Sequence, residues 1–153
     1  MTLDSSEPLI RPLALPDIPY VHAILEESPE AARWSERSLT QVISDGWPAW
    51  VAEKNGKVCG FLIGRVVADE LEILNMAVTT PSRRKGIGSK LVASALEFAR
   101  RSGCPRTYLE VRASNRSAIE LYGRHRFTLS GRRFQYYPDP VEDALLFAFQ
   151  QDS

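Results

Sequence analysis

Apolar residues recur every three to four positions in four segments of the chain, which predicts four helices. These segments are residues 16–27, 35–43, 86–102 and 114–124. In the first segment, a single apolar stripe is formed by Ile18, Val21, Ile24 and Leu25. Gly103 directly follows the third segment, and a glycine in this place commonly ends a helix in the left-handed conformation.

Runs rich in β-branched and aromatic residues alternate with these segments and predict seven strands. They are residues 10–13, 49–53, 58–67, 71–78, 108–112, 127–137 and 144–149. Asn55-Gly56 separates the second run from the third, and this dipeptide favours a tight hairpin turn because both residues tolerate positive φ. In residues 71–78 the alternation of apolar and polar positions stops at Asn75, which indicates a β-bulge or a functional interruption.

The order of these elements is typical of one mixed α/β domain spanning residues 1–153. With 44% hydrophobic and 25% charged residues, the chain has enough apolar material to offset the entropy of folding. No run approaches the roughly 18 apolar residues of a transmembrane helix, and Met1–Glu7 lacks the features of a secretory signal. Because Cys59 and Cys104 are the only cysteines, we expect a cytoplasmic protein without a disulfide framework or metal-ligand cluster.

The 19 basic and 19 acidic side chains cancel over the whole chain but are unevenly distributed. Residues 1–80 contain 12 acidic and 6 basic side chains, a net charge of −6, whereas residues 81–153 contain 7 acidic and 13 basic ones, a net charge of +6. This asymmetry favours an anionic ligand on the C-terminal half, either nucleic acid or a phosphorylated cofactor. It could equally be a chance segregation of solvated surface charges.

A basic loop and a glycine-rich helix start follow the strand at residues 71–78. Arg83-Arg84-Lys85 leads into Gly86-Ile87-Gly88-Ser89, and the first turn of a helix presents unpaired backbone N–H groups that bind anions. The run does not match a Walker A loop, and it lacks the third glycine of a Rossmann fingerprint. The alternative interpretation is a tight turn between strand and helix that binds nothing.

The strand Leu74–Val78 and the pattern Arg83-x-x-Gly86-x-Gly88 together resemble the acetyl-CoA-binding motif of the GNAT superfamily of N-acetyltransferases. Further segments are similar to the RimI-type ribosomal-protein-alanine N-acetyltransferases: residues 33–36, 109–115, 118–119, 121–122, 136–138 and 142–144. The resemblance covers nearly the whole chain. It implies a GNAT-like α/β (mixed α+β) fold, with a central mixed, mostly antiparallel, twisted sheet flanked by about four helices.

The resemblance also implies acetyl-CoA as the cofactor and a set of residues that bind it. Backbone groups of Met76, Ala77 and Val78 would contact the pantetheine arm and the thioester carbonyl. The pyrophosphate would be wrapped by Arg84, Lys85, Gly86, Ile87, Gly88 and Ser89. Asn115 would also touch the cofactor, and no metal is expected.

Glu110 and Tyr122 are the catalytic residues that the resemblance implies, as general base and as the acid that protonates the departing thiolate. An amine attacks a thioester only as the free base, so the site needs a carboxylate within reach. Glu110 lies in an otherwise apolar-flanked run, which is an unusual place for a solvated glutamate, but it could instead pair with an arginine such as Arg112. Tyr122 could instead be a core aromatic residue beside Leu121.

We expect the acceptor to be the N-terminal α-amine of a protein or peptide, which attacks directly in a ternary complex. An α-amine is about 3.5 kcal/mol less costly to deprotonate than a lysine side chain, which suits a single glutamate base. The resemblance implies that Tyr136 and Tyr137 line the acceptor groove and that Trp34 lies on the substrate side. The two tyrosines could equally pack on the sheet, and Trp34 could be a core residue.

The chain departs from the RimI-type pattern at two places. His125-Arg126-Phe127 stands where those enzymes have Leu-Gly-Phe, and the loop at residues 138–141 is shorter than their glycine-containing loop. Since that loop shapes the acceptor groove, a small amine (an amino acid, polyamine or aminoglycoside) is an alternative acceptor. A non-catalytic acyl-CoA-binding module is a further hypothesis, against which the presence of Glu110 and Tyr122 argues. We expect no nucleic-acid or membrane partner, and either a monomer or a homodimer.

Overall fold

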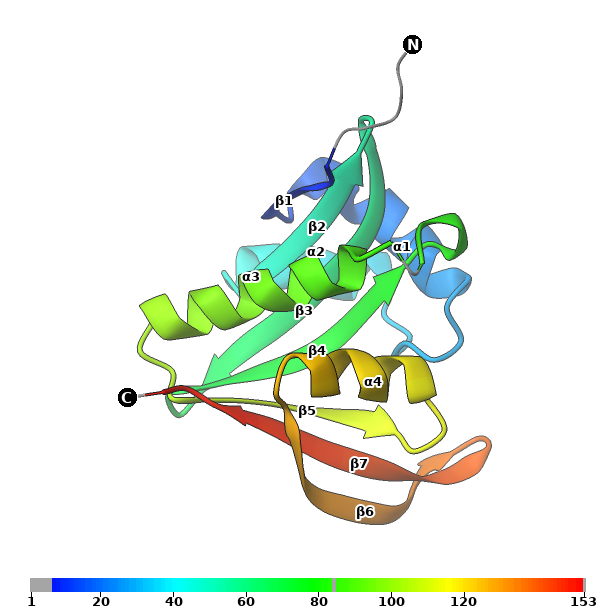
Figure 1. The fold of residues 1–153 in the computed structure, drawn as a ribbon. Coiled ribbons are helices and arrows are strands. Elements are labelled where there is room, and N and C mark those ends of the chain that lie inside the picture. Colours follow the sequence, from blue (N-terminus) through cyan, green and yellow to red (C-terminus); the bar gives the residue numbers. More distant parts are fainter. Residues whose placement is uncertain (1–6, 84, 153) are drawn as a thin grey trace.

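The computed structural model describes residues 7–83 and 85–152, which form one seven-stranded sheet with helices on both faces (Figure 1). The strands are β1 Leu9–Pro12, β2 Ala49–Lys54, β3 Lys57–Val67, β4 Glu70–Val78, β5 Arg106–Arg112, β6 Thr128–Pro138 and β7 Val141–Gln150. The α-helices are α1 Ile18–Glu26, α2 Glu36–Ser44, α3 Ile87–Arg101 and α4 Arg116–Arg124. Short 3₁₀ helices cover Leu15–Asp17 and Thr80–Ser82.

The strand order across the sheet is β1-β2-β3-β4-β5-β7-β6. Only the β4–β5 pairing is parallel, and the other neighbours are antiparallel, which confirms the expected mixed and mostly antiparallel sheet. Asn55 and Gly56 both have positive φ, as the predicted hairpin turn between β2 and β3 requires.

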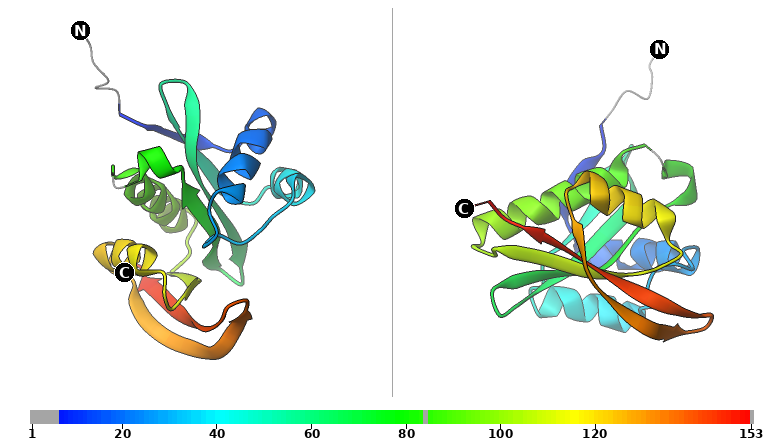
Figure 2. Two further views of the ribbon diagram at one scale, coloured as in Figure 1. Left: turned by 90° about the vertical axis from the view of Figure 1, so that its right-hand side faces the viewer. Right: turned by 60° about the horizontal axis from the view of Figure 1, so that its bottom comes forward.

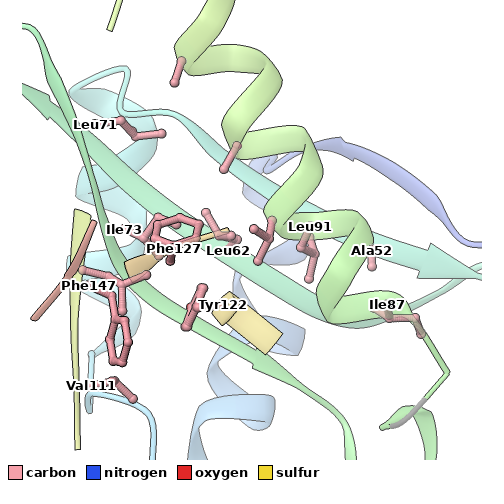
Figure 3. Close-up of a cluster of buried hydrophobic side chains, with 14 of the residues drawn as sticks. Ala52, Leu62, Leu71, Ile73, Ile87, Leu91, Val111, Tyr122, Phe127 and Phe147 are labelled. Atoms are coloured by element: carbon pink, nitrogen blue, oxygen red, sulfur yellow. The ribbon is translucent and has the colours of Figure 1, made fainter. Parts of the chain in front are cut away.

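Two apolar clusters cover opposite faces of the sheet, and Figure 2 shows α1 and α2 on one side with α3 and α4 on the other. Val21 and Leu39 bring α1 and α2 onto Phe61 of β3. The larger cluster joins α3 to the other face, with Leu91 near Leu62 (Figure 3). Neighbouring residues of β3 serve different clusters because side chains alternate between the two faces of a strand.

Strand β4 contains one extra residue at its centre. Ile63 of β3 pairs with Asn75, and the next residue of β3 pairs with Ile73, so Leu74 has no partner on β3. This bulge confirms the interruption expected at Asn75, and bulges increase the local twist of a strand. Among the described residues, the parallel β4–β5 ladder ends at Ile73 and Leu109. Beyond that pair the two strands diverge in Figure 1.

The end of α4 differs slightly from the expected pattern. Phe127 was expected to begin the next strand, but it lies in the core, 4% exposed, and its backbone N–H donates to the carbonyl of Tyr122. Its ring contacts those of Tyr122 and Phe149, so packing around the helix end outweighs strand pairing at this position. Strand β7 also begins at Val141 rather than at Ala144, because the hairpin that joins it to β6 is short.

Arg126 adopts a φ of +68° in the turn between α4 and β6, where the related pattern has glycine. A residue with a Cβ loses about 1–2 kcal/mol in this left-handed region. We therefore expect Arg126→Gly to raise the free energy of unfolding by about 0.5–1 kcal/mol, once the greater freedom of glycine in the unfolded chain is included. The melting temperature should rise by about 2–4 °C. Arg126→Ala keeps the Cβ and should give no such increase in thermal unfolding; equal melting temperatures for the two variants would exclude strain at this residue.

Candidate functional site

A cavity of about 410 Å³, here called the main cavity, lies between the end of β4 and the first turns of α3 and α4. It is lined by seven of the residues that the sequence assigns to the cofactor: Met76, Ala77, Val78, Gly86, Gly88, Ser89 and Asn115. Residues from one strand and the starts of two helices, up to 39 positions apart, therefore share one site.

The other three residues assigned to the cofactor are placed differently. Ile87 is 1% exposed and its side chain packs in the core, so only its backbone is available to a ligand. Lys85 is exposed and is not part of the lining of the main cavity. Arg84 lies outside the described residues.

The end of β4 offers backbone groups to the main cavity. Met76, Ala77 and Val78 pair with β3 along one edge of β4. Along the other edge, the ladder to β5 within the described residues stops at Ile73. Backbone N–H and C=O groups that are not paired within a sheet need another partner. An extended ligand in the main cavity can therefore pair with β4 as a further strand would.

The start of α3 combines open backbone with close helix packing. Gly86 has a φ of +81° and precedes the helix, and apart from its chain neighbours no atom of the described residues lies within 4 Å of the place where its Cβ would be. A Cβ on Gly88 would lie 3.1 Å from Cδ2 of Leu121 on α4. The missing side chains leave the N–H groups of the first helical turn accessible from the cavity, where the helix dipole favours an anion.

Arg83 links the end of β4 to the loop that follows α1. Its Nε donates to the carbonyl oxygen of Val78 at 3.0 Å, and its Nη2 lies 3.5 Å from Oγ of Ser28. The loop brings Ser28, Glu30 and Ala31 into the lining of the main cavity. These three residues were not predicted, because only the tertiary packing of α1 brings them to the site.

One side of α4 completes the main cavity. Asn115 is the N-cap of this helix, and its side-chain oxygen accepts from the backbone N–H of Ala118 at 3.2 Å. Ala118, Leu121 and Arg124 line the cavity at a spacing of three residues. Residues at this spacing share one face of a helix, and the spacing can be seen in the sequence. Of the residues on this face, however, only Asn115 was predicted to contact the cofactor.

His125 contacts the main cavity indirectly, through Ser89. The Nε2 atom of His125 lies 2.7 Å from Oγ of Ser89. Burial and the neighbouring charge of Arg124 lower the pKa of His125, so its ring is neutral at pH 7. The pair holds the end of α4 against the first turn of α3.

Glu110 lies outside the lining of the main cavity, on the face of β5 opposite to its buried neighbours. Leu109 and Val111 belong to the core on the α3 side, so strand alternation directs Glu110 to the other face. Its Oε1 lies 3.2 Å from Nε of Arg133 on β6. The alternative interpretation, an ion pair between Glu110 and an arginine, is therefore confirmed, but the partner is Arg133 and not Arg112, which pairs with Glu142.

Tyr122 occupies the core rather than the lining of the main cavity. It is 5% exposed, and its ring meets that of Phe127 edge-on at 5.3 Å (Figure 3). Burial raises the pKa of Tyr122 well above its usual value, so its hydroxyl remains protonated and able to donate at neutral pH.

Tyr136 and Tyr137 lie near the β6–β7 hairpin, with ring centres 5.2 Å apart. The guanidinium of Arg112 lies 4.2 Å from the ring centre of Tyr137 and also pairs with Glu142. Burial and then the charge of Glu110 raise the pKa of Tyr137.

Trp34 is separate from these residues. It lines a different cavity, which also contains Trp47 and Arg65. Within residues 7–83 and 85–152, no group of three or more His, Cys, Asp or Glu side chains could hold a metal ion. No helix in the same ranges is long and apolar enough to cross a membrane.

Comparisons with known proteins agree with the arrangement of these elements. Residues 18–127 match the acetyltransferase (GNAT) family. The chain is 34% identical over 141 residues to the [ribosomal protein bS18]-alanine N-acetyltransferase of Escherichia coli (strain K12), covering 91% of this chain and 95% of that protein. It is 33% identical over 139 residues to the putative enzyme of the same name from Bacillus subtilis (strain 168), with coverage of 90% and 91%. The crystal structure of the ribosomal-protein-S18-alanine N-acetyltransferase from E. coli superposes with a TM-score of 0.85, at 30% identity and 96% coverage of both chains.

A side chain at position 88 should interfere with a phosphate group at the start of α3. We expect Gly88→Val to weaken acetyl-CoA binding at least tenfold, a loss of about 1.4 kcal/mol, as measured by calorimetry. Because a Cβ there also approaches Leu121, thermal unfolding without ligand must be measured beside it. Gly123→Val is the control, since a Cβ on Gly123 meets nothing within 4 Å. Unchanged affinity in a folded Gly88→Val protein would rule out a phosphate site at this helix start.

Proposed function

This chain belongs to the acetyltransferase (GNAT) family and is an N-acetyltransferase, and we propose that its acceptor is the N-terminal α-amine of a ribosomal protein. The relatives from E. coli and B. subtilis carry names that specify this type of acceptor. Their similarity extends over about nine-tenths of both chains, so it is not confined to the cofactor motif.

The residues present fit acetyl-CoA as the acetyl donor. The pyrophosphate would be held by the N–H groups at the start of α3, supported by Ser89 and the basic side chains nearby. The open edge of β4 at Met76–Val78 would pair with the amides of the pantetheine arm. Gly88 lines the same cavity at the start of α3, and Asn115 would contact the ligand from α4. When bound, acetyl-CoA supplies an acetyl group activated as a thioester.

We assign the acid–base roles to Glu110 and Tyr122. Glu110 would accept a proton from the acceptor ammonium, directly or through water, which leaves the amine able to attack. Its Oε1 lies 3.2 Å from Nε of Arg133, an ion pair that holds the carboxylate on this face of the sheet. Tyr122 would donate its proton to the departing thiolate, and its hydroxyl is protonated at neutral pH because burial raises its pKa.

The observation that carries the proposal is the position of Glu110 relative to the main cavity. The cavity lies between β4 and the α3–α4 side of the sheet, whereas Glu110 faces the other side, where it pairs with Arg133. Donor and acceptor can therefore approach from opposite faces and meet where β4 and β5 part. Tyr136 and Tyr137 would line the route of the acceptor.

A panel of acceptors tests the proposal directly. We expect peptides beginning with a small residue, such as Ala or Ser, to be acetylated with higher kcat/KM than Met- or Leu-initiated peptides, because Tyr136 and Tyr137 would narrow the acceptor groove. Spermidine, free amino acids and an aminoglycoside, assayed by thiol release from acetyl-CoA, should be poor acceptors. Faster turnover of any of these small amines than of every peptide would replace the proposed acceptor with a small amine.

The role of Glu110 has its own test. We expect Glu110→Gln to lower turnover by about 10²- to 10⁴-fold, the usual contribution of a positioned base, with little change in acetyl-CoA affinity. The loss should become smaller as the pH rises above about 8, because more of the acceptor amine is then already neutral.

Arg133→Gln is the matched control, because it breaks the same ion pair but leaves the carboxylate in place. It should retain turnover within a few-fold of the unmodified protein. Equal losses in the two variants would mean that Glu110 acts only through its ion pair.

A further inference from the structure

The cavity that contains Trp34 lies between α2 and the sheet and has a volume of about 350 Å³. Trp34 precedes α2 and Trp47 follows it, and their indoles line the cavity, which we call the indole cavity. Arg65 of β3 and Leu74 of β4 line it from the sheet. Leu74 is the extra residue of the β4 bulge, so this cavity depends on the same irregularity that accompanies the parting of β4 and β5.

Arg65 presents an unused hydrogen-bond donor in this place. Its Nη2 donates to Oε1 of Glu72 at 2.9 Å, and its guanidinium lies 5.4 Å from the ring centre of Trp47. Its Nε is buried and has no hydrogen-bond partner within the described part of the chain. Leaving a buried donor unpaired costs about 1–3 kcal/mol or more, so an oxygen atom supplied by a ligand would be stabilising.

A row of polar side chains connects the indole cavity with Glu110. Arg65 lies opposite Glu72 of β4, and Glu72 lies opposite Tyr108 of β5. Tyr108 and Glu110 are two residues apart on one strand and therefore share a face. Two strand spacings across the sheet and two residues along β5 separate Arg65 from Glu110 by about 12 Å.

We propose that the indole cavity binds an aromatic side chain of the acceptor polypeptide, a few residues downstream of the amine that reaches Glu110. An extended chain advances about 3.3 Å per residue, so the side chain should belong to residue 3, 4 or 5 of the acceptor. The Nε–H of Arg65 donates to a backbone carbonyl of the same segment. This inference rests on the proposed function and assigns Trp34 and Trp47 to acceptor specificity.

The residues that line the indole cavity favour an aromatic side chain over a charged one. Two indoles and the aliphatic side chains of Val42 and Leu74 favour an aromatic ring, which gains both buried area and edge-to-face contacts. A carboxylate is disfavoured because Glu72 already neutralises Arg65. A lysine or arginine side chain would meet the guanidinium and lose its hydration without a counter-ion.

The experiment is a positional scan with peptides that share one N-terminal residue. A phenylalanine is moved through positions 2 to 5 of an otherwise Ser/Gly peptide, and kcat/KM is compared with that of the parent. Binding of the same peptides in the presence of CoA is followed by tryptophan fluorescence, which does not require turnover. We expect one position among 3 to 5 to raise kcat/KM and affinity at least tenfold, mainly through KM.

Two variants and one control connect this preference to the cavity. Gln41→Trp places a large side chain at the cavity wall, and Arg65→Lys keeps a cation beside Glu72 but removes the Nε–H. Both should abolish most of the preference for phenylalanine. Gln41→Trp should leave kcat/KM for the parent peptide within a few-fold, whereas Arg65→Lys should also lower it, because the parent offers the same backbone carbonyl to the Nε–H. Thr40→Trp is the control on the same helix, because Thr40 is exposed and does not line the cavity.

The outcomes separate this inference from the proposed function. Acetylation of all peptides with no positional preference, or a preference that Gln41→Trp leaves intact, overturns the inference alone. Binding of the phenylalanine peptide that requires the cavity, without acetylation of any peptide, supports the inference and overturns the proposed acceptor. If no peptide is bound and none is acetylated, both this inference and the proposed acceptor are overturned.

Discussion

The site depends on a single backbone irregularity, the extra residue Leu74 in the middle of β4. A regular strand would allow β4 to stay paired with β5 along its full length, and hydrogen bonds of the sheet would then consume its backbone groups. With the bulge, the parallel ladder comprises four residue pairs among the described residues, ending at Ile73 and Leu109. The three residues Met76–Val78 then border a cavity instead of a strand. Because the backbone of these residues is not paired with β5, an extended ligand can bind beside it.

The two faces of the sheet carry different groups: the main cavity on one and a row of charged side chains on the other. The main cavity is bordered by the basic, C-terminal part of the chain, with Arg83 and Arg124 in its lining and the positive end of α3 beside them. Nucleic acid and a phosphorylated cofactor both fitted the charge asymmetry of the sequence, and a concave site of this size fits the cofactor. The opposite face carries alternating charges from β3 to β6, of which Glu110 with Arg133 is one pair.

Much of the fold follows from sequence patterns, and seven of the ten residues that the family resemblance assigned to the cofactor line the main cavity. The bulge at Asn75, the Asn115 cap and the helix stop at Gly103 are local features, fixed by hydrogen bonding or by backbone freedom within a few residues. The loop at residues 28–31 and the ion pair of Glu110 with Arg133 are not local, because they join segments that only the folded sheet brings together. Sequence resemblance placed Trp34 on the substrate side, but its neighbours Trp47 and Arg65 emerge only from packing.

The cap of α4 also restricts which atoms a ligand can present. The side-chain oxygen of Asn115 accepts from the backbone N–H of Ala118 and from the hydroxyl of Ser117, which fixes the orientation of the amide. Only the NH₂ group then remains for the main cavity, and it can only donate. A bound molecule must therefore offer a hydrogen-bond acceptor, such as an oxygen atom, at this point. A molecule with only N–H groups there would place its donors opposite the NH₂ donors of Asn115. The same amide that caps the start of α4 therefore also favours ligands with a hydrogen-bond acceptor at this point of the cavity.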